Sequence, residues 1–366
     1  MTNPASLGAI DARRLIARKQ LSPVELAQAC IAQVETLDHA VNALIARDFD
    51  GMLEGAKKAE TAVMTGASLG ALHGLPFAVK DMIDVTGLPT TFGSEAFADN
   101  IATGDDAIVA AMRAAGGLPM GKTNTPEWSA GGNTRNRVNG VTANPYDLTR
   151  TCAGSSGGSA VALACDYAPL ATGSDTGGSL RNPAAYCGIV GYRPSPGVVP
   201  GNTRAAGLIP MPTSGPMARS VADAGLMLSV LARPDRNDPF TTVIDGRTPW
   251  DAASLATLPR RDLTSLRIAV TEDYGFAPTE ALIRDHFRAI LPKLAPFLGE
   301  VTEATPDCTD ADRIFSVLRG VQFLGVHAKL YDETPDHVGP NVADNVREGR
   351  SYSAEDVAQA IFAQGR

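Results

Sequence analysis

Residues 173–181 read Gly-Ser-Asp-Thr-Gly-Gly-Ser-Leu-Arg. One interpretation is a tight turn that leads into a helix, because Gly177 and Gly178 can adopt positive φ and Asp175 or Ser179 can cap a helix. The other is that bare backbone N–H groups surround a serine oxygen, a geometry that side chains would obstruct. Nine residues do not decide between the two, so the neighbouring segments have to.

Glycine is concentrated around this stretch. Residues 154–207 hold 11 of the 36 glycines in the chain. Glycine allows backbone conformations that other residues avoid, and functional residues are commonly carried on loops. We therefore expect a site built on loops in this region.

Upstream of it, short apolar runs alternate with a helical pattern. Residues 75–81 (LPFAVKD) form an apolar run that ends in charge, which is typical of a buried strand. Residues 103–117 carry a helical pattern that a glycine pair ends, and residues 118–124 form a second apolar run. Strand, helix and strand at this interval indicate a βαβ unit, and so a sheet with parallel strands and covered faces.

The flanking segments add further elements. Residues 1–65 read as helices, and Ser22-Pro23-Val24-Glu25 forms a capping box with proline at the first helical position. Residues 233–265 are polar and contain proline, so we expect a surface excursion there. The remaining predictions are a helix over 220–232, a strand over 266–273, a helix over about 278–293 and an amphipathic helix that begins at Ser353.

The composition is that of an ordinary globular protein, with 44% hydrophobic and 20% charged residues. A net charge of −8 without a basic cluster argues against nucleic-acid binding. No segment is apolar for long enough to span a membrane, and the N-terminus lacks the apolar core of a secretory signal. Five cysteines without CxxC spacing indicate free thiols in a reducing compartment. We expect a cytoplasmic protein without nucleic-acid or membrane partners.

The sequence lacks the motifs of several common metal-binding and cofactor-binding sites. No HExxH, Cys/His cluster or GxGxxG occurs, and the sequence predicts no metal and no cofactor. Residues 154–158 (GSSGG) do fit the nucleophile-elbow pattern GxSxG, with Ser156 as the nucleophile. That pattern needs a strand immediately before it, whereas residues 143–153 read as a turn, which disfavours the elbow.

Three polar positions remain: Lys80, Ser155 and Ser179. Taken singly, each has a structural explanation. Lys80 would be a strand-end lysine with its ammonium in water, Ser155 a helix N-cap and Ser179 a turn serine.

Together, the segments around these positions resemble the amidase signature family, the serine hydrolases that use a Ser–cis-Ser–Lys triad. The resemblance covers about residues 70–232 and includes GLPFAVKD, TNTPEW, NPYD, AGSSGGSAVA, GSDTGGSLRNPAAYCGIVGYRPS and SGPMARSVAD. The spacing also matches the family pattern, with 75 residues from Lys80 to Ser155 and 24 from Ser155 to Ser179. It implies an α/β fold: a single large domain whose central mixed β-sheet is covered by helices on both faces.

The resemblance also implies roles. Ser179 would be the nucleophile, Ser155 the serine with a cis peptide, and Lys80 the base. An oxyanion hole would come from the backbone of Thr176, Gly177, Gly178 and Ser179. Substrate contacts would come from Trp128, Ser129, Ala130, Gly131 and Gly132, and support for these loops from Ser156, Asp175 and Arg181.

The chemistry explains why these residue types are needed. A serine hydroxyl is a weak nucleophile until a base takes its proton. Lysine is a base only when neutral, so burial must lower the pKa of Lys80 from about 10.4 to roughly 7.

The implied activity is hydrolysis of a carboxylic acid amide through an acyl-enzyme on Ser179, with a small-molecule amide as substrate and a homodimer as one allowed assembly. Two alternatives stay open. One is the amidase-like subunit of a tRNA-dependent amidotransferase, whose usual MDEF-like stretch is TPEW here (residues 125–128). The other is a non-catalytic scaffold with the same fold.

Family members usually continue beyond the point at which this sequence stops. We therefore expect residues 1–366 to form an amidase signature domain without the usual C-terminal segment. Within it, residues 1–65 would be a helical N-terminal region and residues 70–232 the signature core.

Overall fold

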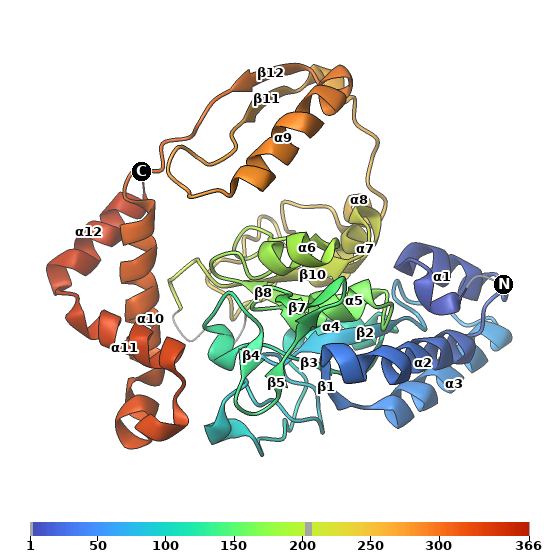
Figure 1. The fold of residues 1–366 in the computed structure, drawn as a ribbon. Coiled ribbons are helices and arrows are strands. Elements are labelled where there is room, and N and C mark those ends of the chain that lie inside the picture. Colours follow the sequence, from blue (N-terminus) through green and yellow to red (C-terminus); the bar gives the residue numbers. More distant parts are fainter. Residues whose placement is uncertain (1–2, 202–206, 366) are drawn as a thin grey trace. The chain divides into compact units, whose positions relative to one another are not determined.

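The computed structural model describes residues 3–201 and 207–365. They divide into two compact units, which are described separately. The first comprises residues 1–258 and 322–350, and the second comprises residues 259–321 and 351–366. Figure 1 gives the element labels.

A six-stranded mixed sheet forms the centre of the first unit, in the order β1-β3-β2-β8-β10-β9. β2 runs parallel to β3 and β8, whereas β1, β9 and β10 pair antiparallel with their neighbours. The strands are β1 (Leu44–Arg47), β2 (Pro76–Lys80), β3 (Leu118–Thr123), β8 (Leu170–Asp175), β9 (Val190–Gly191) and β10 (Thr213–Ala218).

The predicted βαβ unit is confirmed. It consists of β2, α4 (Ala107–Ala114) and β3. Asp106 caps α4 by accepting a hydrogen bond from the Ile108 N–H. Lys80, the last residue of β2, lies opposite Thr123. The unit therefore brings a lysine to the end of a buried central strand.

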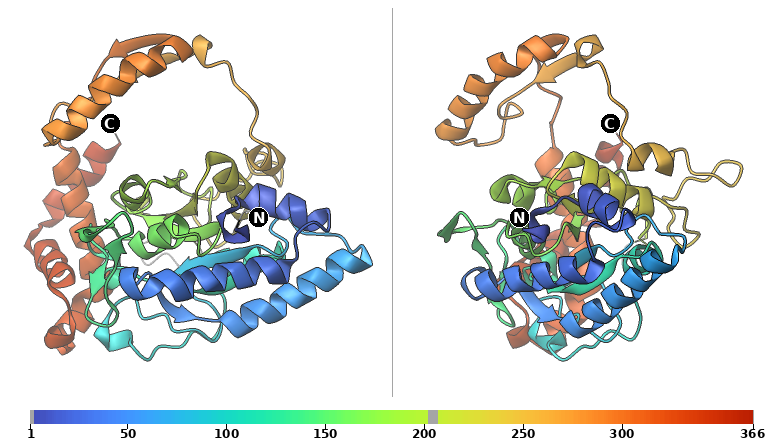
Figure 2. Two further views of the ribbon diagram at one scale, coloured as in Figure 1. Left: turned by 45° about the vertical axis from the view of Figure 1, so that its right-hand side comes forward. Right: turned by 90° about the vertical axis from the view of Figure 1, so that its right-hand side faces the viewer.

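Helices cover both faces of this sheet. Because successive strand residues point to opposite faces, Phe77 and Val79 pack in one apolar cluster and Ala78 in another. Figure 2 shows the helices over the sheet. The first cluster includes residues of α1 (Ala9–Ala17), α4 and α7 (Val221–Leu231). The second includes residues of α5 (Gly157–Ala164) and α6 (Arg181–Cys187). The helices α2 (Pro23–Val41) and α3 (Phe49–Thr65) contribute residues to both clusters. The predicted central mixed sheet with helices on both faces is confirmed.

Two sequence interpretations of local structure were wrong. Residues 1–65 are not all helical, because β1 forms an edge of the sheet against β3. Residues 143–153 are not simply a turn, because β6 (Ala143–Asn144) and β7 (Asp147–Thr151) form a two-stranded hairpin. β7 is exposed throughout, so its sequence lacks the apolar alternation by which strands are recognised.

The remaining elements of the first unit are short or peripheral. Asp251 caps α8 (Ala252–Ala256), which lies within the predicted surface excursion. The others are β4 (Arg135–Asn136), β5 (Gly140–Val141), α11 (Pro340–Ser351), and the single-turn helices Pro4–Ser6, Glu95–Phe97, Glu127–Ser129 and Pro335–His337. α10 (Ala311–Glu333) contributes its residues from 322 onward.

The second unit contains a two-stranded parallel sheet, β11 (Arg267–Val270) with β12 (Glu300–Glu303). α9 (Ala281–Leu294) connects them, so the strand and helix predicted here are confirmed. α12 (Ala354–Gln364) begins with a capping box between Ser353 and Asp356. The unit also contains the single-turn helices Leu263–Ser265 and Ala295–Phe297. In the described part of the chain, no helix combines the length and the apolar character that crossing a membrane requires.

Candidate active site

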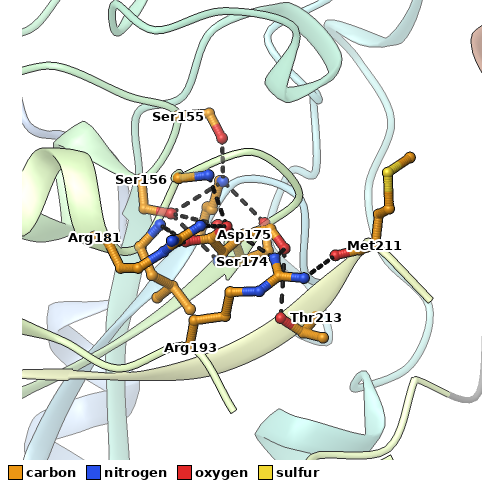
Figure 3. Close-up of polar contacts among 11 residues, drawn as sticks. Ser155, Ser156, Ser174, Asp175, Arg181, Arg193, Met211 and Thr213 are labelled. Atoms are coloured by element: carbon orange, nitrogen blue, oxygen red, sulfur yellow. Dashed lines mark hydrogen bonds and ion pairs between the residues drawn. The ribbon is translucent and has the colours of Figure 1, made fainter. Parts of the chain in front are cut away.

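Lys80 is buried completely beneath three serine hydroxyls. Its Nζ lies 2.7 Å from Ser155 Oγ, 3.1 Å from Ser156 Oγ and 3.0 Å from Ser174 Oγ. Burial lowers the pKa of Lys80 to about 7, although the charge of Asp175 opposes the shift. Figure 3 shows the three serines converging. The environment therefore favours a neutral amine near neutral pH.

A second buried lysine, Lys122 on β3, provides a contrast. Its Nζ lies 3.3 Å from Asp81 Oδ1, and both side chains are fully buried. It also donates to Pro89 O and to Thr90 Oγ1. Lys122 thus has a carboxylate partner, whereas no carboxylate in residues 3–201 or 207–365 forms an ion pair with Lys80.

Ser155 lies in the loop that joins β7 to α5. Its peptide bond to Gly154 is cis, at the serine for which the resemblance implied one. Thr125 Oγ1 donates to Ser155 O (3.0 Å), and the N–H of Ser156 donates to Ser179 O (3.2 Å). These two bonds tie the loop to the segments before and after it.

Ser156 is fully buried. Its Oγ donates to Ser174 O and accepts from Ser174 N, both at 3.3 Å. A nucleophile elbow needs an exposed serine at the end of a strand of the central sheet. Neither condition holds, so the elbow interpretation fails because Ser156 is buried and β7 lies outside the central sheet.

Ser179 lies in the loop between β8 and α6, and it is half-buried. Its hydroxyl makes no hydrogen bond to the residues that the structure describes. The N–H groups of Thr176, Gly177 and Ser179 are likewise without a partner among these residues. The Gly178 N–H differs, because it donates to Asp175 Oδ1 (2.7 Å).

Asp175 organises this loop from the end of β8. Its carboxylate accepts from Gly178 N and Leu180 N (3.1 Å), and it pairs with Arg181 (3.0 Å) and Arg193 (2.9 Å). Burial alone would raise the pKa of Asp175, but the hydrogen bonds from Arg181 and the two N–H groups outweigh it and hold the pKa well below its usual range.

Sequence reasoning missed two residues of this network. Ser174, half-buried at the next-to-last position of β8, lies beside Lys80. Arg193 reaches Asp175 from the segment after β9. Each lies inside a quoted motif, GSDTGG or GYRPS, but neither carries a local signal that distinguishes it from an ordinary strand serine or surface arginine.

The predicted substrate loop, residues 128–132, is linked to Ser155. Ser129 Oγ lies 3.1 Å from Thr125 Oγ1, which in turn binds Ser155 O. Trp128 and Ser129 both have positive φ (50° and 56°). Asn341 Nδ2 donates to Ala130 O (2.6 Å), so α11 holds the loop from the other side. Of the glycines, Gly131 lies beside Asn341, whereas a Cβ on Gly132 would meet nothing within 4 Å.

The Trp128 ring lies within an aromatic cluster. It stacks on Phe92 with ring centroids 4.4 Å apart, meets Phe97 edge-on at 5.1 Å and lies 4.6 Å from His327. Burial lowers the pKa of His327 to about 4, so this ring is neutral. Beside the cluster, Glu127 and Ala130 line an open cleft of about 290 Å³ together with Arg135 and Arg137.

The site consists of a buried lysine beneath paired serines, on a mixed sheet with helices on both faces. This arrangement is that of the amidase fold. The chain belongs to the amidase family, whose model matches residues 25–346. Among solved structures, it resembles a bacterial aryl acylamidase belonging to the amidase signature enzymes, with a TM-score of 0.87 and 26% identity, over 98% of this chain and 75% of that one.

Two curated relatives are more similar in sequence. One is an acylamidase from Rhodococcus erythropolis, 40% identical over 303 residues, which cover 82% of this chain and 62% of the relative. The other is a subunit of the glutamyl-tRNA(Gln) amidotransferase of Salinispora tropica, 37% identical over 309 residues, which cover 83% and 62%. The chain thus spans less than two thirds of the length of either relative.

Proposed function

We propose that this protein hydrolyses a carboxylic acid amide, with Ser179 as the nucleophile, Ser155 as the proton relay and Lys80 as the base. One observation carries the proposal: the buried Lys80 amine lies 2.7 Å from Ser155 Oγ and forms no ion pair with a carboxylate of the described residues. Similarity to an acylamidase supports an amide as the substrate.

The hydrogen bonds around the Lys80 amine indicate the direction of proton transfer between Ser155 and Lys80. A neutral amine has two N–H donors and one lone pair. Ser156 gives its own proton to Ser174 O, so it accepts one N–H of Lys80, and Ser174 Oγ accepts the other. The lone pair then faces Ser155, whose proton has no other acceptor in the described structure.

The reaction follows from this arrangement. As Ser179 Oγ attacks the amide carbon, its proton passes to Ser155 and the Ser155 proton passes to Lys80. The resulting ammonium returns a proton through Ser155 to the departing nitrogen, which leaves the acyl group on Ser179. A water molecule then attacks the acyl carbon by the same proton path and releases the acid.

The tetrahedral oxyanion needs hydrogen-bond donors. We assign this role to the backbone N–H groups of Thr176, Gly177 and Ser179. The Gly178 N–H serves differently, because its bond to Asp175 shapes the turn that presents the other three. Residues 128–132 would border the acyl group, which their link to Ser155 through Thr125 supports.

Gly178→Ala is expected to displace one of the three assigned donors and so to lower kcat by a factor of about 10², the loss typical of one oxyanion donor. Gly178 has φ +116°, a conformation that is strained for any residue with a Cβ, and the added Cβ would lie 2.6 Å from the Asn182 side-chain amide. Gly104→Ala is the control, because its Cβ would meet nothing within 4 Å. Steady-state kinetics with a chromogenic anilide would measure both, and wild-type kcat in Gly178→Ala would refute the assignment.

The second candidate, an amidotransferase subunit, is favoured by the similarity to the Salinispora tropica amidotransferase protein. Ammonia release from a panel of simple amides by the purified chain separates the candidates. We expect release without any partner protein. Turnover that requires amidotransferase partners would favour the second candidate, and a folded chain without turnover or serine labelling would favour a scaffold. A cytoplasmic location and a homodimer remain predictions from the sequence.

A further inference from the structure

Arg193 has no place in the mechanism so far, yet it contacts the loop that carries the nucleophile. We propose that Arg193 is a positioning residue of the oxyanion hole, which fixes the peptide group between Asp175 and Thr176. The inference rests on the proposed amide hydrolysis, since it concerns one of the three N–H donors assigned to the oxyanion.

The guanidinium bridges two separate segments. Nη1 donates to the carbonyl oxygen of Asp175 and to its Oδ1 (2.9 Å), and Nη2 donates to Met211 O (2.8 Å). Its side chain is 24% exposed, compared with 56% for Arg181 on the same carboxylate. Figure 3 shows Arg193 between Asp175 and Met211.

The bond to the carbonyl oxygen carries the argument. The Asp175 C=O and the Thr176 N–H belong to one planar peptide group, so a bond that orients the oxygen also orients the N–H. Thr213 Oγ1 adds a second, longer contact to the same oxygen at 3.4 Å. A cationic donor on the oxygen also polarises the peptide and strengthens its N–H as a donor.

The bond to the carboxylate acts on the rest of the loop. Asp175 holds the N–H groups of Gly178 and Leu180, and Arg193 holds Asp175. The bond to Met211 O then anchors this assembly to the residues that precede β10. Arg193 therefore links the turn around Ser179 to the segment that leads into β10.

Arg193→Met is expected to lower kcat for a chromogenic anilide by about 10²-fold, while KM changes less than about threefold. Oxyanion donors act mainly on the transition state, so their loss appears in kcat. The inhibition constant of a boronic acid, which forms a tetrahedral adduct with the serine, should rise by a similar factor. Arg193→Lys should recover part of the loss, because an ammonium can still bind the carbonyl oxygen.

Arg219 provides a matched control. Its side chain is 19% exposed, pairs with Asp166 and donates to backbone oxygens, including Leu163 O and Ala168 O, away from the site. Arg219→Met should lower the urea midpoint but leave kcat and boronate inhibition of the folded protein unchanged. Wild-type kcat and boronate affinity in Arg193→Met would overturn the inference, as would a loss no greater than that of Arg219→Met. If wild type itself lacks turnover, the proposed function fails instead.

Discussion

Lys80→Met is expected to abolish amide turnover while the protein remains folded. Methionine keeps the length and apolar character of the side chain but removes the nitrogen that would accept the Ser155 proton. Loss of a positioned base typically costs about 10²–10⁴ in rate. Lys80→Arg should fail as badly, because a guanidinium does not deprotonate in this pH range. The measurement is anilide turnover by each variant, with folding checked by circular dichroism.

The pH dependence tests the same assignment in wild type. Because the base must be neutral, kcat/KM should rise as the pH rises through about 7, the pKa to which burial lowers Lys80. His73→Gln is the control, since the His73 ring is buried against Ala59 O, 3.0 Å away, and has no contact with the site. Near-normal turnover by the Lys80→Met variant, together with no turnover by the His73→Gln variant, would show that Lys80 is not the base.

Stability gives a readout that does not depend on activity. Between pH 7 and 10.5 the unfolded chain protonates Lys80 while the folded protein does not, so the folded state loses stability as the pH falls through this range. The full loss of folding stability, on the order of 5 kcal/mol from the difference between the folded and unfolded pKa values, is reached below about pH 7. Urea titrations at pH 6 and pH 10 should show a smaller difference for Lys80→Met than for wild type.

Ser179→Ala is expected to remove both turnover and labelling by a fluorophosphonate probe. Removal of the catalytic serine from a serine hydrolase lowers kcat by a factor on the order of 10⁶. The wild-type chain should carry one label, on Ser179, whose hydroxyl is half-buried and has no protein partner in the described structure. Intact mass and peptide mapping after labelling measure both expectations.

Ser156→Ala is the informative comparison for this experiment. Ser156 is buried and bonded to Ser174, so its loss should weaken the support of Lys80 but leave Ser179 available to the probe. Labelling that persists in Ser179→Ala and disappears in Ser156→Ala would restore Ser156 as the nucleophile.

The sequence by itself determined the fold class and the positions that matter for the proposed chemistry. β2, α4 and β3 were predictable because their apolar runs and helix signals are local. Lys80, Ser155 and Ser179 were found because each lies in a motif long enough to be specific. β1 was missed because its four residues are too few to carry a pattern, and only pairing with β3 makes them a strand.

The tertiary structure alone decided which polar groups meet. Lys80 is the last residue of β2 and Lys122 the next-to-last of β3, and both are buried. Only the fold gives Lys122 the carboxylate of Asp81 and Lys80 three serine hydroxyls. The fold likewise lets the Gly178 N–H donate a hydrogen bond to the Asp175 carboxylate, and it brings Arg193 to the same carboxylate. A hydrogen bond forms only within about 3 Å, and such proximity between distant segments arises from packing rather than from any local pattern.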